Sequence, residues 1–86
     1  MTTVIAFHDV DDVEHWLASP KREEIFGPLG ITVRTFVDPD GSKRTGLILE
    51  VPDLDEFQAV MASEAAAEAM SYDGVHANTV VMLVES

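Results

Sequence analysis

The stretch FHDVDDVEHW, Phe7–Trp16, holds two histidines and four carboxylates within ten residues. Imidazole and carboxylate are side chains that bind zinc and other divalent metals. Carboxylates are also typical of helix starts, where they accept hydrogen bonds from unpaired backbone N–H groups and lie near the positive end of the helix dipole. The stretch therefore has two interpretations, a metal site or the start of a capped helix.

An internal repeat favours the helix start. A shift of 44 residues places Val10–Ile31 over Leu54–Val75, with both Ala-Ser pairs and both closing glycines in register. The acids of the first half then align with acids of the second: Asp9, Asp11 and Asp12 with Asp53, Asp55 and Glu56. The histidines have no counterpart in the second half. Helix capping accounts for the acids of both halves, so we predict no metal site.

The repeat and the hydrophobic periodicity predict a strand, a helix and a strand in each half of one domain, residues 1–42 and 43–86. We expect strands at 3–8, 31–37, 44–51 and 79–85, with the turn DPDGSK between the middle two. Helices are expected from about 10 and 54, each restarting at a serine, Ser19 or Ser63. Their inward stripes would be Val10, Val13 and Leu17 in the first helix and Leu54, Phe57 and Met61 in the second.

The order βαββαβ predicts a ferredoxin-like α+β fold. In this fold a four-stranded antiparallel sheet carries two helices, here each broken, on one face, with the first and third strands central. We expect the helices to cover Ile5, Phe7, Leu47, Leu49 and Val51, and the other face to carry Val4, Ala6, Ile48, Val80 and Met82. Strands that are half exposed should alternate apolar and polar residues, and these do not. A second copy is therefore expected to cover the second face, giving a homodimer.

The helix breaks at "ASP" and "ASE", the helix exit "DGV" and the chain length resemble the dimeric α/β-barrel superfamily. The chain is similar to its antibiotic-biosynthesis-type monooxygenases and stress-responsive barrel proteins. The resemblance implies two ferredoxin-like subunits packed sheet to sheet around a cavity. Haem-degrading members rely on an Asn, a Trp and a His at set places, which Trp16 and Asn78 do not match. No catalytic residue is carried over from the superfamily.

Composition excludes several classes of function. There is no cysteine, which removes disulfides, thiolate metal sites and a cysteine nucleophile. The net charge of −11, from five basic and sixteen acidic residues, opposes binding to nucleic acid or to an anionic membrane. No signal peptide or membrane-spanning run is present in the sequence, so a cytoplasmic protein is expected. No cofactor motif is found.

Two histidines are candidates for proton transfer. His8 continues the parity of Val4 and Ala6, which would place it on the cavity-side face at the end of the first strand. The last strand would bring His76 opposite His8, with Asn78 close by. Imidazole titrates near neutrality, so such a pair could serve general acid–base catalysis. The alternative is that both are polar strand ends near solvent.

Arg34 and Glu50 are predicted to be direct or diagonal neighbours on the same cavity-side face, which also carries one aromatic residue, Phe36. They form either an ion pair that sets the dimer register, or Arg34 binds an anionic or enol group. The predicted ligand-binding residues are Arg34, Phe36, Glu50 and Asn78. Other charged residues, Lys21 and Arg22 among them, are expected in solvent.

Two functions remain open. The first is a small enzyme without a tightly bound cofactor, which acts on an apolar or aromatic molecule between the sheets as a monooxygenase, cyclase or isomerase. The second is a non-catalytic dimer that binds a ligand or has an accessory or regulatory role. A haem-binding barrel is a third, more distant alternative, since it requires a buried axial histidine.

Overall fold

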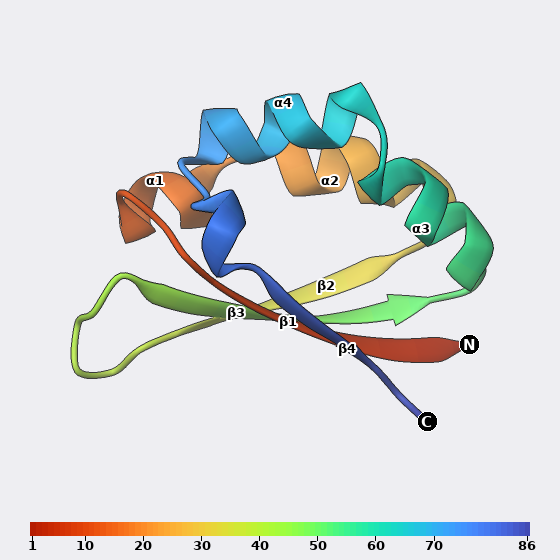
Figure 1. Cartoon of the computed structure of the whole chain (residues 1–86), viewed down its shortest axis with the longest axis horizontal. Helices are drawn as coiled ribbons and strands as arrows, with labels where there is room; N and C mark the ends of the chain where they lie inside the picture. The colour runs from red at the N-terminus through yellow and green to blue at the C-terminus, as the bar shows by residue number, and fades with distance from the viewer.

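A computed structural model describes residues 1–86 (Figure 1). The strands are β1 (Thr2–Asp9), β2 (Thr32–Val37), β3 (Arg44–Val51) and β4 (Val81–Val84). The helices are α1 (Val13–Ala18), α2 (Lys21–Phe26), α3 (Leu54–Met61) and α4 (Glu64–Asp73), with two short 3-10 helices, η1 (Gly27–Leu29) and η2 (Ala77–Thr79). None of these helices has the length and hydrophobicity needed to cross a membrane.

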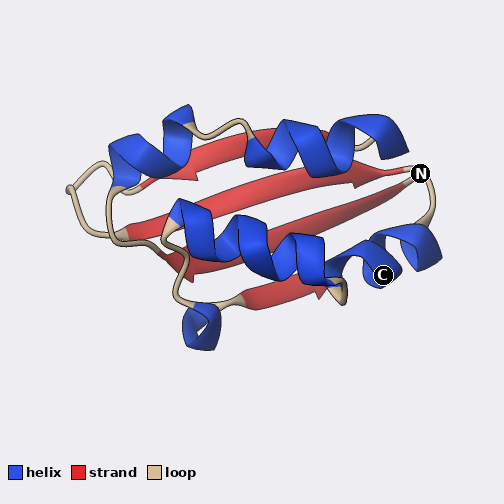
Figure 2. Ribbon diagram, turned by 90° about the horizontal axis from the view of Figure 1, so that it is seen from above, coloured by secondary structure: helices blue, strands red, loops and turns tan.

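The sheet is antiparallel with the strand order β2-β3-β1-β4, so the first and third strands are central, as predicted. All four helices lie over one face of this sheet (Figures 1 and 2). No element covers the opposite face (Figure 1). The predicted ferredoxin-like βαββαβ fold, with each helix broken in two, is confirmed.

Carboxylates cap the helices as the repeat predicts. Asp12 accepts hydrogen bonds from the backbone N–H groups of Glu14 and His15 at the start of α1. Asp53, which the repeat aligns with Asp9 rather than with Asp12, accepts one from Glu56 at the start of α3. Of the four acids of the opening stretch, Asp12 caps α1 and Glu14 lies in its first turn. Asp9 instead pairs with Arg44, and Asp11 contacts His76.

Serine hydroxyls begin the second segment of each broken helix. Ser19 accepts a hydrogen bond from the N–H of Lys21, and Ser63 accepts one from the N–H of Ala66. The predicted breaks at these two serines are confirmed.

The first helix buries a different stripe from the predicted one. It begins at Val13 rather than Val10, because Val10 instead forms a β-bridge with Val75. The helix therefore turns a different side toward the core from the one predicted: Trp16 is buried at 1% exposure, whereas Leu17 is 44% exposed. The expectation that Leu17 points inward is wrong. In the second half Leu54, Phe57 and Met61 pack into the core as expected.

The predicted orientation of β1 and β4 is wrong: the residues expected on the open face lie beneath the helices. Directly paired residues share a face, and Val4 pairs with Leu49 and Ala6 with Leu47, all buried under the helices. Leu47, Leu49 and Val51 face the helices as predicted, whereas Val4 and Ala6 were expected on the other face. Ile5 and Phe7, predicted to be covered by the helices, lie on the open face instead.

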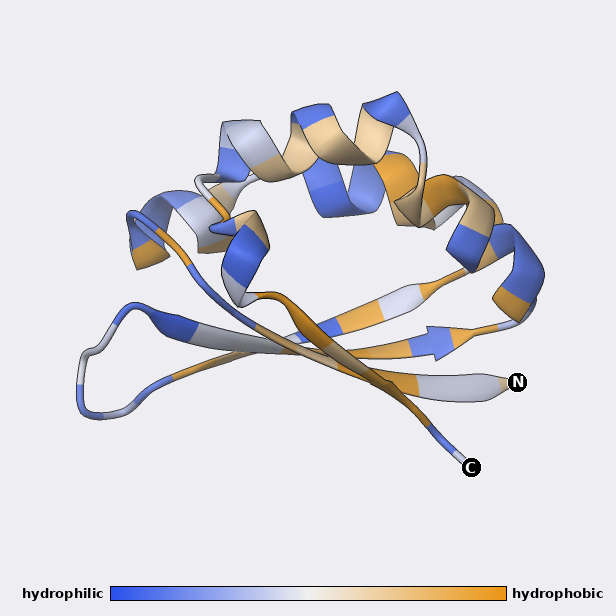
Figure 3. Cartoon of the chain, viewed as in Figure 1, coloured by the Kyte–Doolittle hydropathy of each residue, from blue (hydrophilic) through white to orange (hydrophobic).

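β4 shows the same reversal. Met82 pairs with Ala6 and so lies on the helix side, and Val80 precedes the strand and borders the space beneath the helices. The physical reason is that the middle of β1, residues 4–7, and the whole of β4 are unbroken apolar runs (Figure 3). Alternation of residue types could therefore not distinguish one face from the other.

The open face of the sheet carries a contiguous apolar patch. The strand register places Ile5 beside Ile48 and Leu83, and Phe7 beside Val81. Phe36 of β2 extends the patch across Gly46. Its large members are between 37% and 56% exposed: Ile5, Phe7, Phe36, Val81 and Leu83. Patches of this kind on a soluble domain mark interaction surfaces.

Candidate functional site

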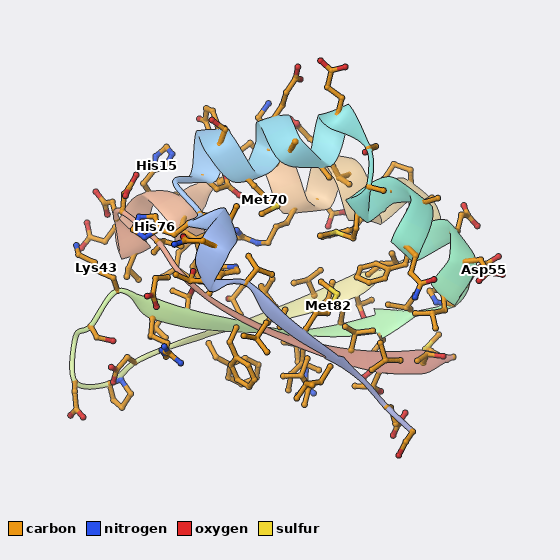
Figure 4. The ribbon with its side chains drawn as sticks, viewed as in Figure 1. His15, Lys43, Asp55, Met70, His76 and Met82 are labelled. Carbon is orange, nitrogen blue, oxygen red and sulfur yellow. The ribbon has the colours of Figure 1, made fainter.

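A cavity of about 70 Å³ lies between the helices and the sheet. It is lined by 16 residues, of which 12 are hydrophobic. Met70 of α4 and Met82 of β4 lie in this space between the two layers (Figure 4). The four polar or charged side chains in the lining are His8, Lys21, Arg22 and Asp73.

His8, near the end of β1, is 6% exposed and lies directly across from Thr45 of β3. The Thr45 hydroxyl donates to the backbone carbonyl of His8 at 3.0 Å, and its oxygen lies 2.7 Å from His8 Nδ1. A hydroxyl has a single hydrogen, so both bonds form together only when Nδ1 carries a proton and donates to Thr45. In the neutral ring Nε2 is then the acceptor, and no protein group is hydrogen-bonded to it.

Trp16 joins His8 to the charged residues of the cavity. The His8 imidazole and the Trp16 indole meet edge to face, with ring centroids 5.5 Å apart and ring planes at 85°. The Arg22 guanidinium lies 4.6 Å from the centroid of the same indole, within the range of a cation–π contact. His8, Trp16 and Arg22 therefore form one cluster at the end of the cavity.

A buried ion pair completes the cluster. Arg22 Nη1 lies 3.6 Å from Asp73 Oδ2, with side chains only 14% and 5% exposed. This distance is too long for a hydrogen bond. Arg22 Nη1 and Asp73 Oδ1 are both buried without any hydrogen-bond partner. Burial lowers the pKa of Arg22 and the negative charge of Asp73 raises it; a guanidinium nevertheless stays charged.

Sequence reasoning missed both members of this pair, and it placed Arg22 in solvent. The signal was present in the helical spacing. Arg22 lies three and four residues before Ile25 and Phe26, and all three line the cavity. Asp73 follows Ala66, Ala69 and Met70 at the same kind of spacing. Each charge therefore extends an apolar helix face, which is where a buried charge is to be expected.

Burial lowers the pKa of His8 below its ordinary value of 6.5, and the positive charge of Arg22 acts in the same direction. The neutral imidazole is thus the form that the folded protein favours at neutral pH. A neutral imidazole with a free Nε2 in an apolar cavity can accept a proton.

This pKa shift predicts a pH dependence of stability. Below pH 6.5 the unfolded chain takes up a proton at His8 while the folded chain resists it, so the free energy of unfolding should fall as the pH is lowered through this range. Urea unfolding from neutral to mildly acidic pH measures the effect. In His8→Gln the loss of stability across this range should be smaller, whereas the matched variant His15→Gln should retain it. An unchanged profile in His8→Gln would contradict the shift.

The predicted pairing of His8 with His76 is wrong. His8 lies on the helix side of the sheet, not on the open face, and its cross-strand neighbour is Thr45. His76 precedes η2 and contacts the carboxylate of Asp11. The cause is the register of β4, which pairs Val4 with Val84, whereas His76 opposite His8 would require Val80 opposite Val4. η2 takes up Thr79, which was expected to begin the strand, and also contains Asn78, which is exposed.

Arg34, Phe36 and Glu50 lie on the open face as predicted, but they do not line the cavity. Thr32 is the direct partner of Glu50, so Arg34 is its diagonal neighbour. The Glu50 carboxylate accepts a hydrogen bond from Thr3 at 2.9 Å rather than forming an ion pair with Arg34. A role of these residues in ligand binding stays a prediction.

The remaining histidine, His15, lies on the exposed side of α1 (Figure 4). Its Nε2 is 2.8 Å from the backbone oxygen of Tyr72. No group of three or more histidine and acidic side chains comes together in the structure as a metal site.

The fold and the cavity define a small ferredoxin-like α+β protein with an apolar site beneath its helices. By sequence, neither a protein-family model nor a curated protein matches the chain. By structure, the chain shares the fold of an antibiotic biosynthesis monooxygenase, with a TM-score of 0.66, 16% identity and coverage of 100% of this chain and 97% of that one. The superfamily resemblance suggested by the sequence is thus supported at the level of the fold.

Two further solved structures have the same fold. One is described as a dimeric protein of unknown function with a ferredoxin-like fold, from Bacteroides fragilis, with a TM-score of 0.61, 16% identity and coverage of 99% and 94% of the two chains. The other is an ethyl tert-butyl ether d family protein from Bacillus halodurans, with a TM-score of 0.58, 19% identity and coverage of 100% and 97%. At such identities the likeness concerns the fold, which hosts more than one function.

Proposed function

We propose that the protein is a homodimeric enzyme that binds a small apolar or aromatic molecule in the cavity of each subunit. His8 takes a proton from that molecule, in a cofactor-independent reaction of the monooxygenase, cyclase or isomerase type. The observation that carries the proposal is the free Nε2 of His8 in a cavity whose lining is 12 of 16 hydrophobic residues. The structural likeness to an antibiotic biosynthesis monooxygenase supports this general kind of activity.

The size of the cavity limits the ligand. Its volume of about 70 Å³ is roughly half of the 150 Å³ that an engineered apolar cavity offers to benzene. A ring therefore requires side chains to move. Three of the lining residues are methionines, Met61, Met70 and Met82, whose unbranched side chains adapt readily. Haem, which is far larger than benzene, does not fit this cavity.

His8 has the features that proton abstraction needs. Thr45 fixes the tautomer and the ring orientation, so that Nε2 is the basic nitrogen. Burial among mostly apolar side chains lowers the pKa of His8 and so favours the neutral imidazole, the form that accepts a proton. A second candidate function, ligand binding without catalysis, is favoured by how few polar groups the cavity contains.

Hydrogen–deuterium exchange at the α-carbon of cyclopentanone in D₂O, followed by NMR, tests His8 directly. A ketone bound in the cavity should lose an α-proton to Nε2, and wild-type protein should accelerate the exchange. His8→Gln should lose about 10²- to 10⁴-fold of that acceleration, the usual contribution of a general base. His15→Gln is the control, since His15 lies outside the cavity, and it should exchange like the wild type.

The two candidate functions give different results in this experiment. Saturable binding of cyclopentanone without faster exchange would favour the non-catalytic function. Exchange that is as fast in His8→Gln as in His15→Gln would reject His8 as the base. Absence of binding would reject the cavity as a ligand site.

The apolar patch on the open face supports a homodimer. Its exposed side chains come from β1, β2 and β4, with the half-buried Ile48 of β3 between them. Burial of this apolar area at roughly 25 cal/mol per Å² would stabilise a sheet-to-sheet pair. In a dimer with two-fold symmetry the same patch of both subunits meets, and an apolar patch can pack against its own copy. The Bacteroides fragilis protein with this fold is described as dimeric.

Leu83→Lys should convert the dimer to a monomer at micromolar concentration. Leu83 is 56% exposed in the single chain, so the lysine costs the subunit little, whereas a charge within the interface is desolvated without a partner. Leu17→Lys, at 44% exposure on α1, is the matched control and should remain dimeric. Light scattering measures both. A monomeric wild type, or a dimeric Leu83→Lys, would contradict the proposed interface.

A further inference from the structure

We infer that the charged end of the cavity selects a ligand with a neutral hydroxyl group, an alcohol or a phenol. Arg22 Nη1 and Asp73 Oδ1 would recognise this hydroxyl together. The inference rests on the proposed function only in that the cavity binds a ligand, and it does not require His8 to be catalytic.

The two unpartnered atoms carry the inference. Arg22 Nη1 is a buried donor without an acceptor, and Asp73 Oδ1 is a buried acceptor without a donor. Both residues line the cavity, and the Asp73 side chain is only 5% exposed. Buried polar groups in proteins are almost always hydrogen-bonded, so an unsatisfied donor beside an unsatisfied acceptor is an arrangement prepared for a third group.

A hydroxyl matches this arrangement because it donates one hydrogen bond and accepts others. Its hydrogen would go to Asp73 Oδ1, and its oxygen would accept from Arg22 Nη1. The gap of 3.6 Å between the two side chains, too long for a direct hydrogen bond, means that a bridging group would break no existing bond.

Other polar groups satisfy only half of the pair. A ketone or an ether accepts from Arg22 but leaves Asp73 without a donor. A carboxylate also accepts only, and its charge would oppose that of the Asp73 carboxylate inside a cavity of low polarity. An ammonium group donates to Asp73 but meets the positive charge of Arg22. The cluster therefore discriminates by hydrogen-bond type and by charge.

Three probes of similar shape test the inference: toluene, phenol and benzoate at neutral pH. The NMR signal of the indole N–H of Trp16 reports binding, since Trp16 is the single tryptophan and contacts Arg22. In a purely apolar cavity toluene would bind more tightly than phenol, because a hydroxyl loses hydrogen bonds to water. Here phenol should bind about 10- to 100-fold more tightly than toluene, as expected for hydrogen bonds to charged groups, and benzoate should bind most weakly.

The double variant Arg22→Met with Asp73→Leu is the control. It removes both charges together, and replacing a buried ion pair by apolar side chains of similar volume is often neutral for stability. In this variant the preference should reverse, with toluene binding more tightly than phenol.

The outcomes separate this inference from the proposed function. If the wild type binds toluene as tightly as phenol or more tightly, the hydroxyl selectivity is overturned, but the cavity remains a ligand site. A water molecule hydrogen-bonded to both Arg22 and Asp73 would give this result. Tightest binding of benzoate would show a site for anions and would also overturn it. Failure of all three probes to bind would overturn both the cavity as a ligand site and the selectivity.

Discussion

Arg22→Met should lower the free energy of unfolding by about 3–5 kcal/mol, the usual cost of removing one partner of a buried ion pair. The substitution leaves the Asp73 carboxylate, only 5% exposed, without its counter-charge. It also removes the cation–π contact with Trp16. A domain of this size has a total stability of only about 5–13 kcal/mol, so the loss should be evident in urea unfolding at a fixed protein concentration.

The double variant Arg22→Met with Asp73→Leu should regain most of that stability. With both charges removed, no desolvated carboxylate remains, and the apolar side chains extend the hydrophobic lining of the cavity. A single variant as stable as the wild type would show that Arg22 and Asp73 are exposed in solution. A double variant as unstable as the single one would contradict the assignment of the cost to the unpaired Asp73.

Trp16→Ala should cost about 3–5 kcal/mol, as is typical for truncation of a large buried aromatic side chain. Trp16 is 1% exposed and contacts both His8 and Arg22, so the substitution removes core packing and two aromatic contacts together. Urea unfolding followed by far-ultraviolet circular dichroism measures the loss without relying on tryptophan fluorescence.

Its neighbour Leu17 is the matched control. Leu17→Ala should cost less than about 1 kcal/mol, because the side chain is 44% exposed and loses little buried area. The comparison also distinguishes the two orientations of the first helix. A larger loss for Leu17→Ala than for Trp16→Ala would restore the stripe expected from the sequence and contradict the structure.

The elements and their order could be predicted from the sequence because each has its own local signal. The carboxylates before the two helices, the serines at the breaks and the turn DPDGSK fix where the chain changes direction. The alignment of the two halves supports the helix-start acids and the serines with a second copy. These features determine the topology without any knowledge of the strand faces.

The orientation of β1 could not be predicted, because both of its faces are apolar. Ile5 and Phe7 were expected beneath the helices, yet the structure places the smaller Val4 and Ala6 there. Ala6 lines the cavity, so its small side chain helps to leave that space open. The open face then receives the large side chains, as an interface between subunits requires.

The candidate site was predicted in part. The choice of His8 as a candidate for proton transfer stays a prediction, and the face of the sheet expected for it was wrong. Its expected partner depended on a strand register that sequence does not specify. The β4 register and the insertion of η2 take His76 and Asn78 away from it. Arg22 and Asp73 were missed because charged residues are seldom buried, and only the apolar spacing around them indicated otherwise.

The most direct test of the site is to locate a bound apolar probe with NMR of isotope-labelled methionine methyl groups. The chain has four methionines, of which Met61, Met70 and Met82 line the cavity, while Met1 is 83% exposed. Titration with toluene should shift the three cavity signals along one saturable curve and leave Met1 unchanged. Shifts of Met1 alone, equal shifts of all four signals, or no shift at any of the cavity methionines would contradict a ligand site between the helices and the sheet.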